Sequence, residues 1–147
     1  MKNYNLCEYS KNYDQGPKPF IFHPCYTSNS NSNFRTTMWT GQNMQLTLMC
    51  IPPHSDIGLE IHDDVDQFIC ITNGKAKICM GNSKNNLQSH SCLNENYALI
   101  IPAGTWHNII NVGCGPLNLY SLYAPPQHPY NTVHPRKIDD KKSISYD

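Results

Sequence analysis

The chain is divided into short apolar segments at regular intervals, and this pattern restricts its fold more than any other feature. We predict β-strands over residues 34–40, 44–51, 57–62, 67–72, 75–80, 97–101, 106–112 and 117–123. Turn-favouring residues separate these segments, for example Pro52-Pro53 and Asn73-Gly74. No stretch shows a sustained helical period, so we expect little helix. Many short strands with Gly, Asn and Pro between them are typical of an all-β sandwich or barrel.

The strand-rich region is predicted to have distinct flanks. Residues 1–33 are expected to form an N-terminal arm, with a short strand at 20–22 followed by a polar linker. Residues 34–124 are expected to form the barrel. Residues 125–147 are predicted to be a C-terminal extension that crosses the barrel end, because its prolines exclude a central strand. A chain of 147 residues is long enough for one domain with a proper core.

Composition argues against several classes of partner. The chain has 11 basic and 11 acidic residues, which gives no electrostatic reason to expect nucleic acid or an anionic membrane as a partner. No apolar run is long enough to span a bilayer, and the first residues lack the apolar core of a secretory signal. The seven cysteines include no C-x2-C pair. Free thiols and a cytoplasmic location are therefore expected.

Two segments carry residues that could bind a metal ion. Glu60 and His62 alternate along a predicted strand, so they share a face and lie about 7 Å apart. Gln67 opens the next strand, and a Pro-x-Gly turn places His107 at the start of another. Two imidazoles, a carboxylate and an amide would together suit one divalent ion. Zinc, manganese, nickel and iron all fit such mixed ligands.

The spacing of these residues resembles the two motifs of the cupins. The first motif is matched by Glu60-x-His62-x4-Gln67-x6-Gly74, and the second by Asn96-x5-Pro102-x-Gly104-x2-His107-x3-Asn111. The resemblance implies a double-stranded β-helix, or jelly-roll, barrel. It also implies that one divalent metal ion is held by His62, His107, Glu60 and Gln67.

The chain departs from the family pattern at three positions, and the departures leave alternatives open. Glu60 stands where the family usually has histidine, Gln67 where it has glutamate, and Asn96 where it has glycine. Glu60 is therefore either a metal ligand or a catalytic general base. Gln67 either binds the metal through its carbonyl oxygen or is an amide bonded to Glu60 or to backbone. His54 is a rival ligand that could replace Gln67 or Glu60, although we favour a place at the rim.

Candidate substrate-binding residues come from the flanking strands. Arg35, if it points inward, would bind a carboxylate or phosphate through two parallel hydrogen bonds, and otherwise it is an exposed strand residue. Tyr123 is a candidate for the wall of a pocket that stacks a sugar ring. Asn111 is a candidate partner for the metal ligands. His128 and His134 either overhang the pocket or lie at the surface, and we favour the surface.

Three functions follow as hypotheses. The resemblance implies a metal-dependent isomerase or lyase acting on a sugar or sugar acid, similar to proteins described as mannose-6-phosphate isomerase-like. A non-haem iron dioxygenase using Glu60, His62 and His107 is the second hypothesis. The third is a binding module for a small carbohydrate or a metal, without turnover. The resemblance also implies a homodimer, for which an exchanged strand at 20–22 would be suitable.

Overall fold

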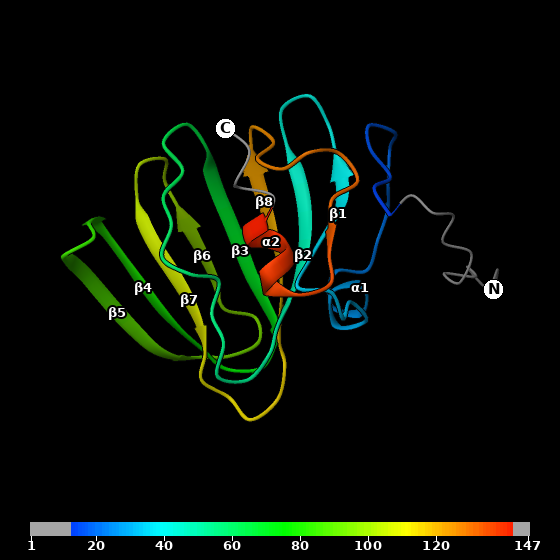
Figure 1. Ribbon diagram of the computed structural model, residues 1–147. Coiled ribbons are helices and arrows are strands. Elements are labelled where there is room, and N and C mark those ends of the chain that lie inside the picture. Colours follow the sequence, from blue (N-terminus) through cyan, green and yellow to red (C-terminus); the bar gives the residue numbers. More distant parts are fainter. Residues whose placement is uncertain (1–12, 143–147) are drawn as a thin grey trace.

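The computed structural model describes residues 13–142, which form two facing antiparallel sheets (Figure 1). The strands are β1 Arg35–Thr40, β2 Gln45–Ile51, β3 Asp66–Asn73, β4 Ala76–Ser83, β5 Asn86–Leu93, β6 Ala98–Ile101, β7 Trp106–Asn111, β8 Leu117–Ala124 and β9 Val133–His134. One sheet has the order β6-β3-β8-β2-β1-β9, and the other has the order β5-β4-β7. The described helices are short: α1 is Pro24–Asn29 and α2 is Lys137–Lys142. The all-β prediction is confirmed.

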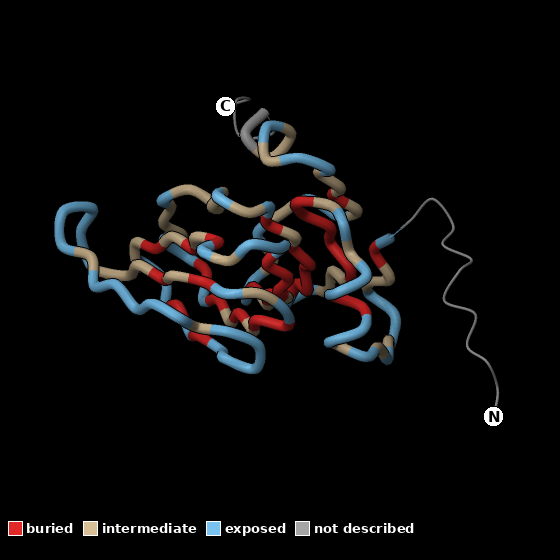
Figure 2. Tube along the Cα trace, turned by 90° about the horizontal axis from the view of Figure 1, so that it is seen from below, coloured by how far each residue is buried: buried red, intermediate tan, exposed pale blue. Residues whose placement is uncertain are grey.

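Alternation along β3 separates the interior of the barrel from its outer face. Gln67, Ile69 and Ile71 are buried, whereas Phe68 and Cys70 are half-buried on the other side, as the strand pattern predicts. The inward isoleucines pack against residues from the three-stranded sheet, including Ile78 and Ile109. Figure 2 shows the buried segments gathered between the sheets. This apolar core fills one part of the barrel interior, and buried polar residues such as Gln67 and His107 occupy the other part.

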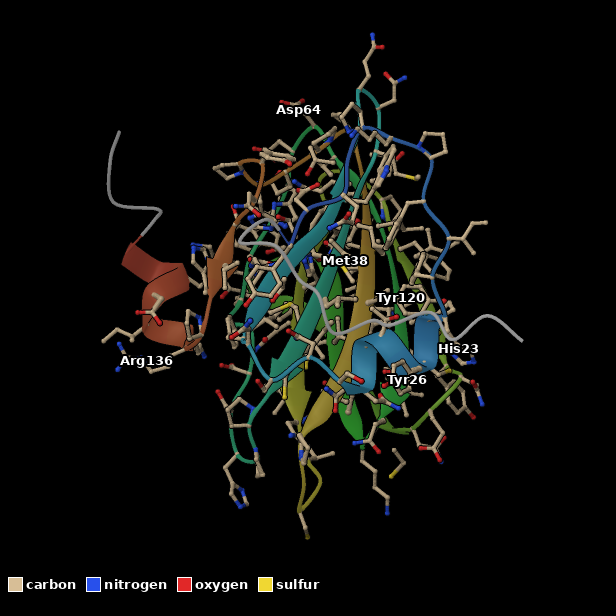
Figure 3. The ribbon with its side chains drawn as sticks, turned by 90° about the vertical axis from the view of Figure 1, so that its right-hand side faces the viewer. His23, Tyr26, Met38, Asp64, Tyr120 and Arg136 are labelled. Carbon is tan, nitrogen blue, oxygen red and sulfur yellow. The ribbon has the colours of Figure 1, made fainter. Side chains whose placement is uncertain are left out.

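The N-terminal segment covers the outer face of the six-stranded sheet. Residues 20–22 form no strand, so that prediction is wrong, yet Phe20 and Phe22 pack on an outer cluster that contains Trp39. Part of the predicted linker forms α1 instead, because the His23 side chain caps the helix by accepting from the Tyr26 amide at 3.1 Å. Figure 3 shows α1 and α2 on opposite sides of the sheet. The proposed three-part division stays a prediction, and residues 1–12 and 143–147 of its flanks lie outside the described part.

The predicted strand at 57–62 is replaced by an irregular segment. It runs antiparallel to β7 and pairs with that strand through isolated bridges of Asp56 with Ile110 and of Glu60 with His107. Gly58, between the two bridges, has a φ of 90°, which breaks the regular strand conformation. The segment nevertheless stays bonded to β7, so Glu60 and His62 are still delivered to the barrel interior.

β5 was not predicted from the sequence. Residues 81–95 read as a polar connection, because most side chains there are polar and show no alternation. In the structure they extend the β4–β5 hairpin, most of whose β5 side chains are exposed. Backbone pairing with β4 therefore forms this strand without a buried face.

Gly104 fixes the turn that leads into β7, and we expect its replacement by alanine to destabilise the protein. Its φ is 78°, and a Cβ at this position would meet no atom within 4 Å, so strain comes from the backbone alone. A left-handed conformation costs a residue with a Cβ about 1–2 kcal/mol. Urea unfolding should show a loss of that size for Gly104→Ala. Gly115→Ala is the matched control, since Gly115 lacks the positive φ and also has open space.

Candidate metal centre

Backbone pairing places Glu60 opposite His107. The Glu60 amide donates to the His107 carbonyl at 3.0 Å, and the His107 amide donates back to the Glu60 carbonyl at 2.9 Å. Residues that exchange both bonds stand directly across from each other, so their side chains leave the same face. His62 follows two residues after Glu60, and its carbonyl accepts from the Gly104 amide at 2.8 Å. Backbone hydrogen bonds therefore fix the positions of Glu60, His62 and His107.

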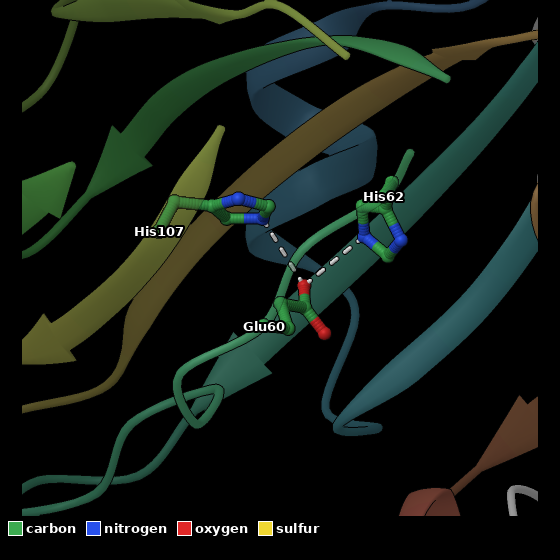
Figure 4. A group of neighbouring side chains, drawn as sticks. All are labelled: Glu60, His62 and His107. Carbon is green, nitrogen blue, oxygen red and sulfur yellow. Dashed lines mark ion pairs between the residues drawn. The ribbon is translucent and has the colours of Figure 1, made fainter. Parts of the chain in front are cut away.

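The three side chains converge on one point. Glu60 Oε1 lies 3.4 Å from His62 Nε2 and 3.3 Å from His107 Nε2 (Figure 4). One ligand atom from each residue lies within 4.8 Å of the other two. Two donors that bind an ion at about 2.1 Å are about 3.0 Å apart at a right angle and about 3.4 Å apart at a tetrahedral angle. The observed separations therefore fit donors around a single cation.

The imidazole nitrogens at this point have no other hydrogen-bond partner. His62 Nε2 and His107 Nε2 are both buried from solvent, and the Glu60 carboxylate is the polar group beside both of them. His107 Nδ1 lies 2.9 Å from the Thr105 carbonyl oxygen, which can only accept, so Nδ1 carries the proton. The lone pair of Nε2 then points toward the cluster. This is the tautomer that a metal ligand requires, with its other nitrogen held by a carbonyl.

Glu60 is held as a carboxylate. Burial raises the pKa of Glu60, but without metal the hydrogen bonds and charge of His107 and His62 outweigh burial, and the pKa of Glu60 lies well below the ordinary value of 4.5. An ionised carboxylate can bind a cation at neutral pH without first losing a proton. The geometry therefore favours the ligand role for Glu60 over a free general base.

The lowered pKa of Glu60 predicts a specific acid response of the metal-free protein. Because the folded pKa is below the unfolded one, the stabilising contribution is complete above the unfolded pKa and is lost as the pH falls toward the folded pKa. Urea unfolding from pH 7 to pH 3 should show a steeper loss of stability below about pH 5 in the wild type than in Glu60→Gln. Exposed Glu95 provides the control variant Glu95→Gln, which should follow the wild type.

Gln67, the remaining predicted ligand, has a buried side-chain oxygen without a partner. It is buried in the inward row of β3, and its amide nitrogen donates to Ser121 Oγ at 2.8 Å. Its carbonyl oxygen is buried and has no hydrogen-bond partner. Such an orphaned acceptor costs about 1–3 kcal/mol, and binding a cation would offset that cost. The amide is not bonded to Glu60, so that alternative for Gln67 is not what the structure shows.

Arg35 and Tyr123 both lie inside the barrel. Arg35 is 2% exposed, and its Nη1 donates to Tyr123 Oη at 3.0 Å. Its other nitrogens bind Asp140 of α2, with 2.6 Å between Nε and Oδ1. The Tyr123 ring lies edge-on to His62, with 6.0 Å between ring centres. Arg35 therefore points into the barrel, and Tyr123 packs beside the Glu60-His62-His107 group.

The sequence did not identify the residues that the C-terminal extension brings to this cavity. His128 was predicted at the surface, but it lines the cavity, and its Nε2 is buried without a hydrogen-bond partner. Burial and Arg35 lower the pKa of His128 to about 3, so it is neutral at pH 7. His134 and Asp140 line the same cavity. The sequence signals were the expectation that this extension crosses the barrel end and the less favoured alternative that His128 and His134 overhang the pocket.

The loop that carries His128 is held from inside the barrel by Gln45. The Gln45 amide donates to the His128 carbonyl at 2.8 Å, and its carbonyl oxygen accepts from the His128 amide at 2.9 Å. Gln45 itself is fully buried at the start of β2. This pair of bonds ties the cavity rim to the sheet.

Two other candidates prove to lie elsewhere. His54 is exposed and is not part of the ligand cluster, so it does not replace Gln67 or Glu60. Asn111 is buried, but its side chain bonds the backbone at Ile51, Gly113 and Gly115 rather than the ligands. The motif asparagine is therefore a structural residue that ties β7 to its neighbours.

A double-stranded β-helix with a Glu-His-His cluster inside is the class of protein that fold and site together define. Comparison with known families agrees, because the sequence profile of the cupin domain matches residues 47–123. The chain belongs to the cupin family. Among the residues that the structure describes, no helix is long and apolar enough to cross a membrane.

Two curated relatives share much of the sequence. The uncharacterised protein YrkC of Bacillus subtilis is 49% identical over 126 residues, which are 86% of this chain and 68% of that protein. The uncharacterised protein L612 of Acanthamoeba polyphaga mimivirus is 39% identical over 108 residues, which are 73% of this chain and 66% of that protein. The chain thus spans about two thirds of the length of each.

Solved structures confirm the architecture. The crystal structure of BH2720 from Bacillus halodurans has a TM-score of 0.87 and 45% sequence identity, and the match covers 88% of this chain and 98% of that one. A protein from Klebsiella pneumoniae with a double-stranded β-helix domain has a TM-score of 0.60 at 17% identity, covering 81% of this chain and 100% of that one. At that lower identity, the second match supports the fold alone.

Proposed function

We propose that the protein binds one divalent metal ion through Glu60, His62 and His107, with the Gln67 carbonyl oxygen as a fourth ligand. The observation that carries this proposal is the convergence of three ligand atoms whose two imidazole nitrogens have no other hydrogen-bond partner. Nitrogen and oxygen donors in this ratio suit zinc, manganese, nickel or iron.

We further propose that the site is that of a metal-dependent isomerase or lyase acting on a sugar or sugar acid. A bound cation would supply Lewis-acid polarisation of a substrate carbonyl or hydroxyl oxygen. The chain itself provides a small cavity of about 250 Å³ beside the cluster. Glu60 and His62 form part of its wall, and neutral His128 faces the same space. Polar groups around a confined space favour a small polar substrate.

The finer expectation of a mannose-6-phosphate isomerase-like enzyme is supported less well by the cavity. Lys75 is exposed and Lys77 alternates with fully buried Ala76 and Ile78, so neither lysine lines the cavity. Arg35 is the single arginine or lysine that lines it within the described residues. A single guanidinium suits one carboxylate as well as a phosphate, which favours a sugar acid among the proposed substrates.

One observation also favours the iron dioxygenase as a second candidate. Two histidines and one carboxylate on one side of a cation are the ligand set of non-haem iron oxygenases. The two candidates require the same residues but different metals and a different co-substrate. Metal identity and oxygen consumption therefore discriminate between them.

The test combines metal analysis with a substrate panel. Untagged protein, purified without chelator, is analysed for metals and then incubated with aldoses, ketoses and sugar acids in D₂O. Exchange or loss of a carbon-bound proton in the NMR spectrum, with zinc, manganese or nickel bound and no oxygen uptake, supports the isomerase or lyase. Iron with substrate-dependent oxygen uptake supports the dioxygenase. Bound metal without turnover indicates a binding module, and failure to bind any of the four metals overturns the proposal.

A further inference from the structure

The cavity beside the metal cluster contains a second set of polar groups, which the metal does not require. Besides Glu60 and His62, its wall is formed by Arg35, Gln127, His128, Pro129, Thr132, His134 and Asp140. A cavity of about 250 Å³ is small even for a drug-like ligand. One small molecule in this space would therefore reach both the ligand cluster and Arg35.

Arg35 is a buried cation whose strongest partner comes from outside the barrel. Its Nε donates to Asp140 Oδ1 at 2.6 Å, and its Nη2 donates to Asp140 Oδ2 at 3.4 Å. This arrangement is the two-pronged pairing of a guanidinium with a carboxylate. A buried guanidinium is costly without an anion beside it, so this position requires some negatively charged partner for Arg35.

Asp140 is attached to the barrel by charged contacts rather than by apolar packing. It belongs to α2, and His134 Nδ1 also lies 2.8 Å from its Oδ1. Lys137 of the same helix pairs with Asp56. Ile138, the one large apolar residue of α2, is 52% exposed. Little apolar burial of α2 therefore opposes its release.

Resting on the proposed metal-dependent function, we propose that Arg35, together with His134, is the binding subsite for a carboxylate group of the substrate, and that Asp140 occupies this subsite until the substrate displaces it. The substrate class is then a small hydroxy or oxo acid. Its carboxylate binds Arg35, while an oxygen at its other end reaches the Glu60 and His62 side of the cavity. Displacement exchanges one carboxylate for another, so the buried guanidinium stays paired throughout.

The chemistry of the resident group favours a carboxylate over a phosphate. Asp140 shows that the space around Arg35 accepts two oxygens of a planar anion. A phosphate carries about one more negative charge at pH 7 and commonly needs further cations. Within the described residues, Arg35 is the only arginine or lysine on this wall.

The test measures binding of glycolate, the simplest hydroxy acid, by calorimetry on the full chain as purified. Ethylene glycol, which lacks the carboxylate, and inorganic phosphate are the comparison ligands. Removing the internal competitor in Asp140→Asn should raise the affinity for glycolate about tenfold, which corresponds to loss of an ion pair of about 1.4 kcal/mol. Asp139→Asn, on the same helix but paired with Arg136, should leave the affinity unchanged. Arg35→Lys keeps the charge, loses the two-pronged geometry and should weaken binding about tenfold.

Several results would overturn the inference. These are unchanged glycolate affinity in Asp140→Asn, unchanged affinity in Arg35→Lys, equal binding of ethylene glycol, or tighter binding of phosphate. Circular dichroism checks that the variants fold. If a variant does not fold, hydrogen exchange of the wild type tests the displacement of Asp140 instead. Saturating glycolate should accelerate exchange of the α2 amides. Unchanged or slower exchange of these amides would contradict displacement.

The same titration on metal-depleted protein separates this inference from the proposed function. Arg35 binds the carboxylate directly, so a weaker but Asp140-sensitive interaction should persist without metal. A protein that binds no metal yet shows this sensitivity would refute the function and keep the subsite. A protein that binds metal but shows no effect of Asp140→Asn would keep the proposed metal site and refute the carboxylate subsite.

Discussion

His107→Ala is expected to lose its high-affinity metal binding. Removing a group that only orients a metal ligand costs about 10–100-fold in affinity, so removing the ligand itself should exceed about 100-fold. Calorimetric titration with zinc and with manganese measures the loss, and elemental analysis of purified protein should show substoichiometric metal. His62→Ala should act in the same direction, because its Nε2 occupies the other side of Glu60.

Two controls make the result specific to ligation. His54→Ala removes an exposed imidazole outside the cluster and should retain metal. His107 is fully buried, so an alanine there also leaves a cavity. His107→Gln fills most of that space, and it should fold while binding metal more weakly than the wild type. Full metal occupancy in both His62→Ala and His107→Ala would show that the ligand assignment is wrong.

The largest loss of stability is expected for Asn111→Ala. The amide of Asn111 donates to the carbonyls of Ile51 at 2.8 Å and Gly115 at 2.9 Å. Its side-chain oxygen accepts from the Gly113 amide at 2.9 Å. Each buried group left without a partner costs about 1–3 kcal/mol. Because Gly113 and Gly115 lie near solvent, we expect a total loss of about 3–5 kcal/mol in urea unfolding.

The neighbouring asparagine provides the comparison for this prediction. The Asn108 side-chain nitrogen donates to Asp56 Oδ2 at 2.9 Å, and Asn108→Ala should cost about 0.5–1.5 kcal/mol. Folded Asn111→Ala should bind metal with an affinity close to that of the wild type, since its contacts are with backbone. A stability loss no larger than that of Asn108→Ala would contradict the structural role.

Strands with alternating burial were predictable from sequence, whereas the other segments were not. β3 and β7 bury nearly every second residue, because one face of each points into the barrel. β5 lacks this signal, since it forms through backbone pairing with its side chains in water. The strand predicted at 57–62 had a suitable pattern, but Gly58 interrupts it with a left-handed conformation.

The convergence of Glu60, His62 and His107 was predictable for a similar reason. Glu60, His62 and His107 lie on segments whose pairing follows from the barrel, so their spacing in the sequence determines their meeting in space. Gln67 as a fourth ligand stays a prediction, supported by its unpaired carbonyl oxygen. The homodimer and the cytoplasmic location also stay predictions.

The far wall of the cavity lacked any comparable signal. His128 and Asp140 belong to loop and helix residues after the last long strand, where no periodicity relates a side chain to a direction. Their positions depend on long-range contacts such as those of Gln45 and Arg35. Such contacts join residues far apart in the chain, and a single sequence does not reveal which polar groups will pair.

The pair of hydrogen bonds between Gln45 and the His128 backbone has an evolutionary consequence. Both hydrogen-bonding ends of this fully buried amide bind the backbone of one loop residue, so the position of the loop depends on a residue that does not line the cavity. Exchanging Gln45 for a shorter or longer side chain would reshape the entrance while the cation-binding groups stay in place. Related proteins could therefore diverge in the molecules they accept through changes hidden beneath the surface, where inspection of contacting residues would not find them.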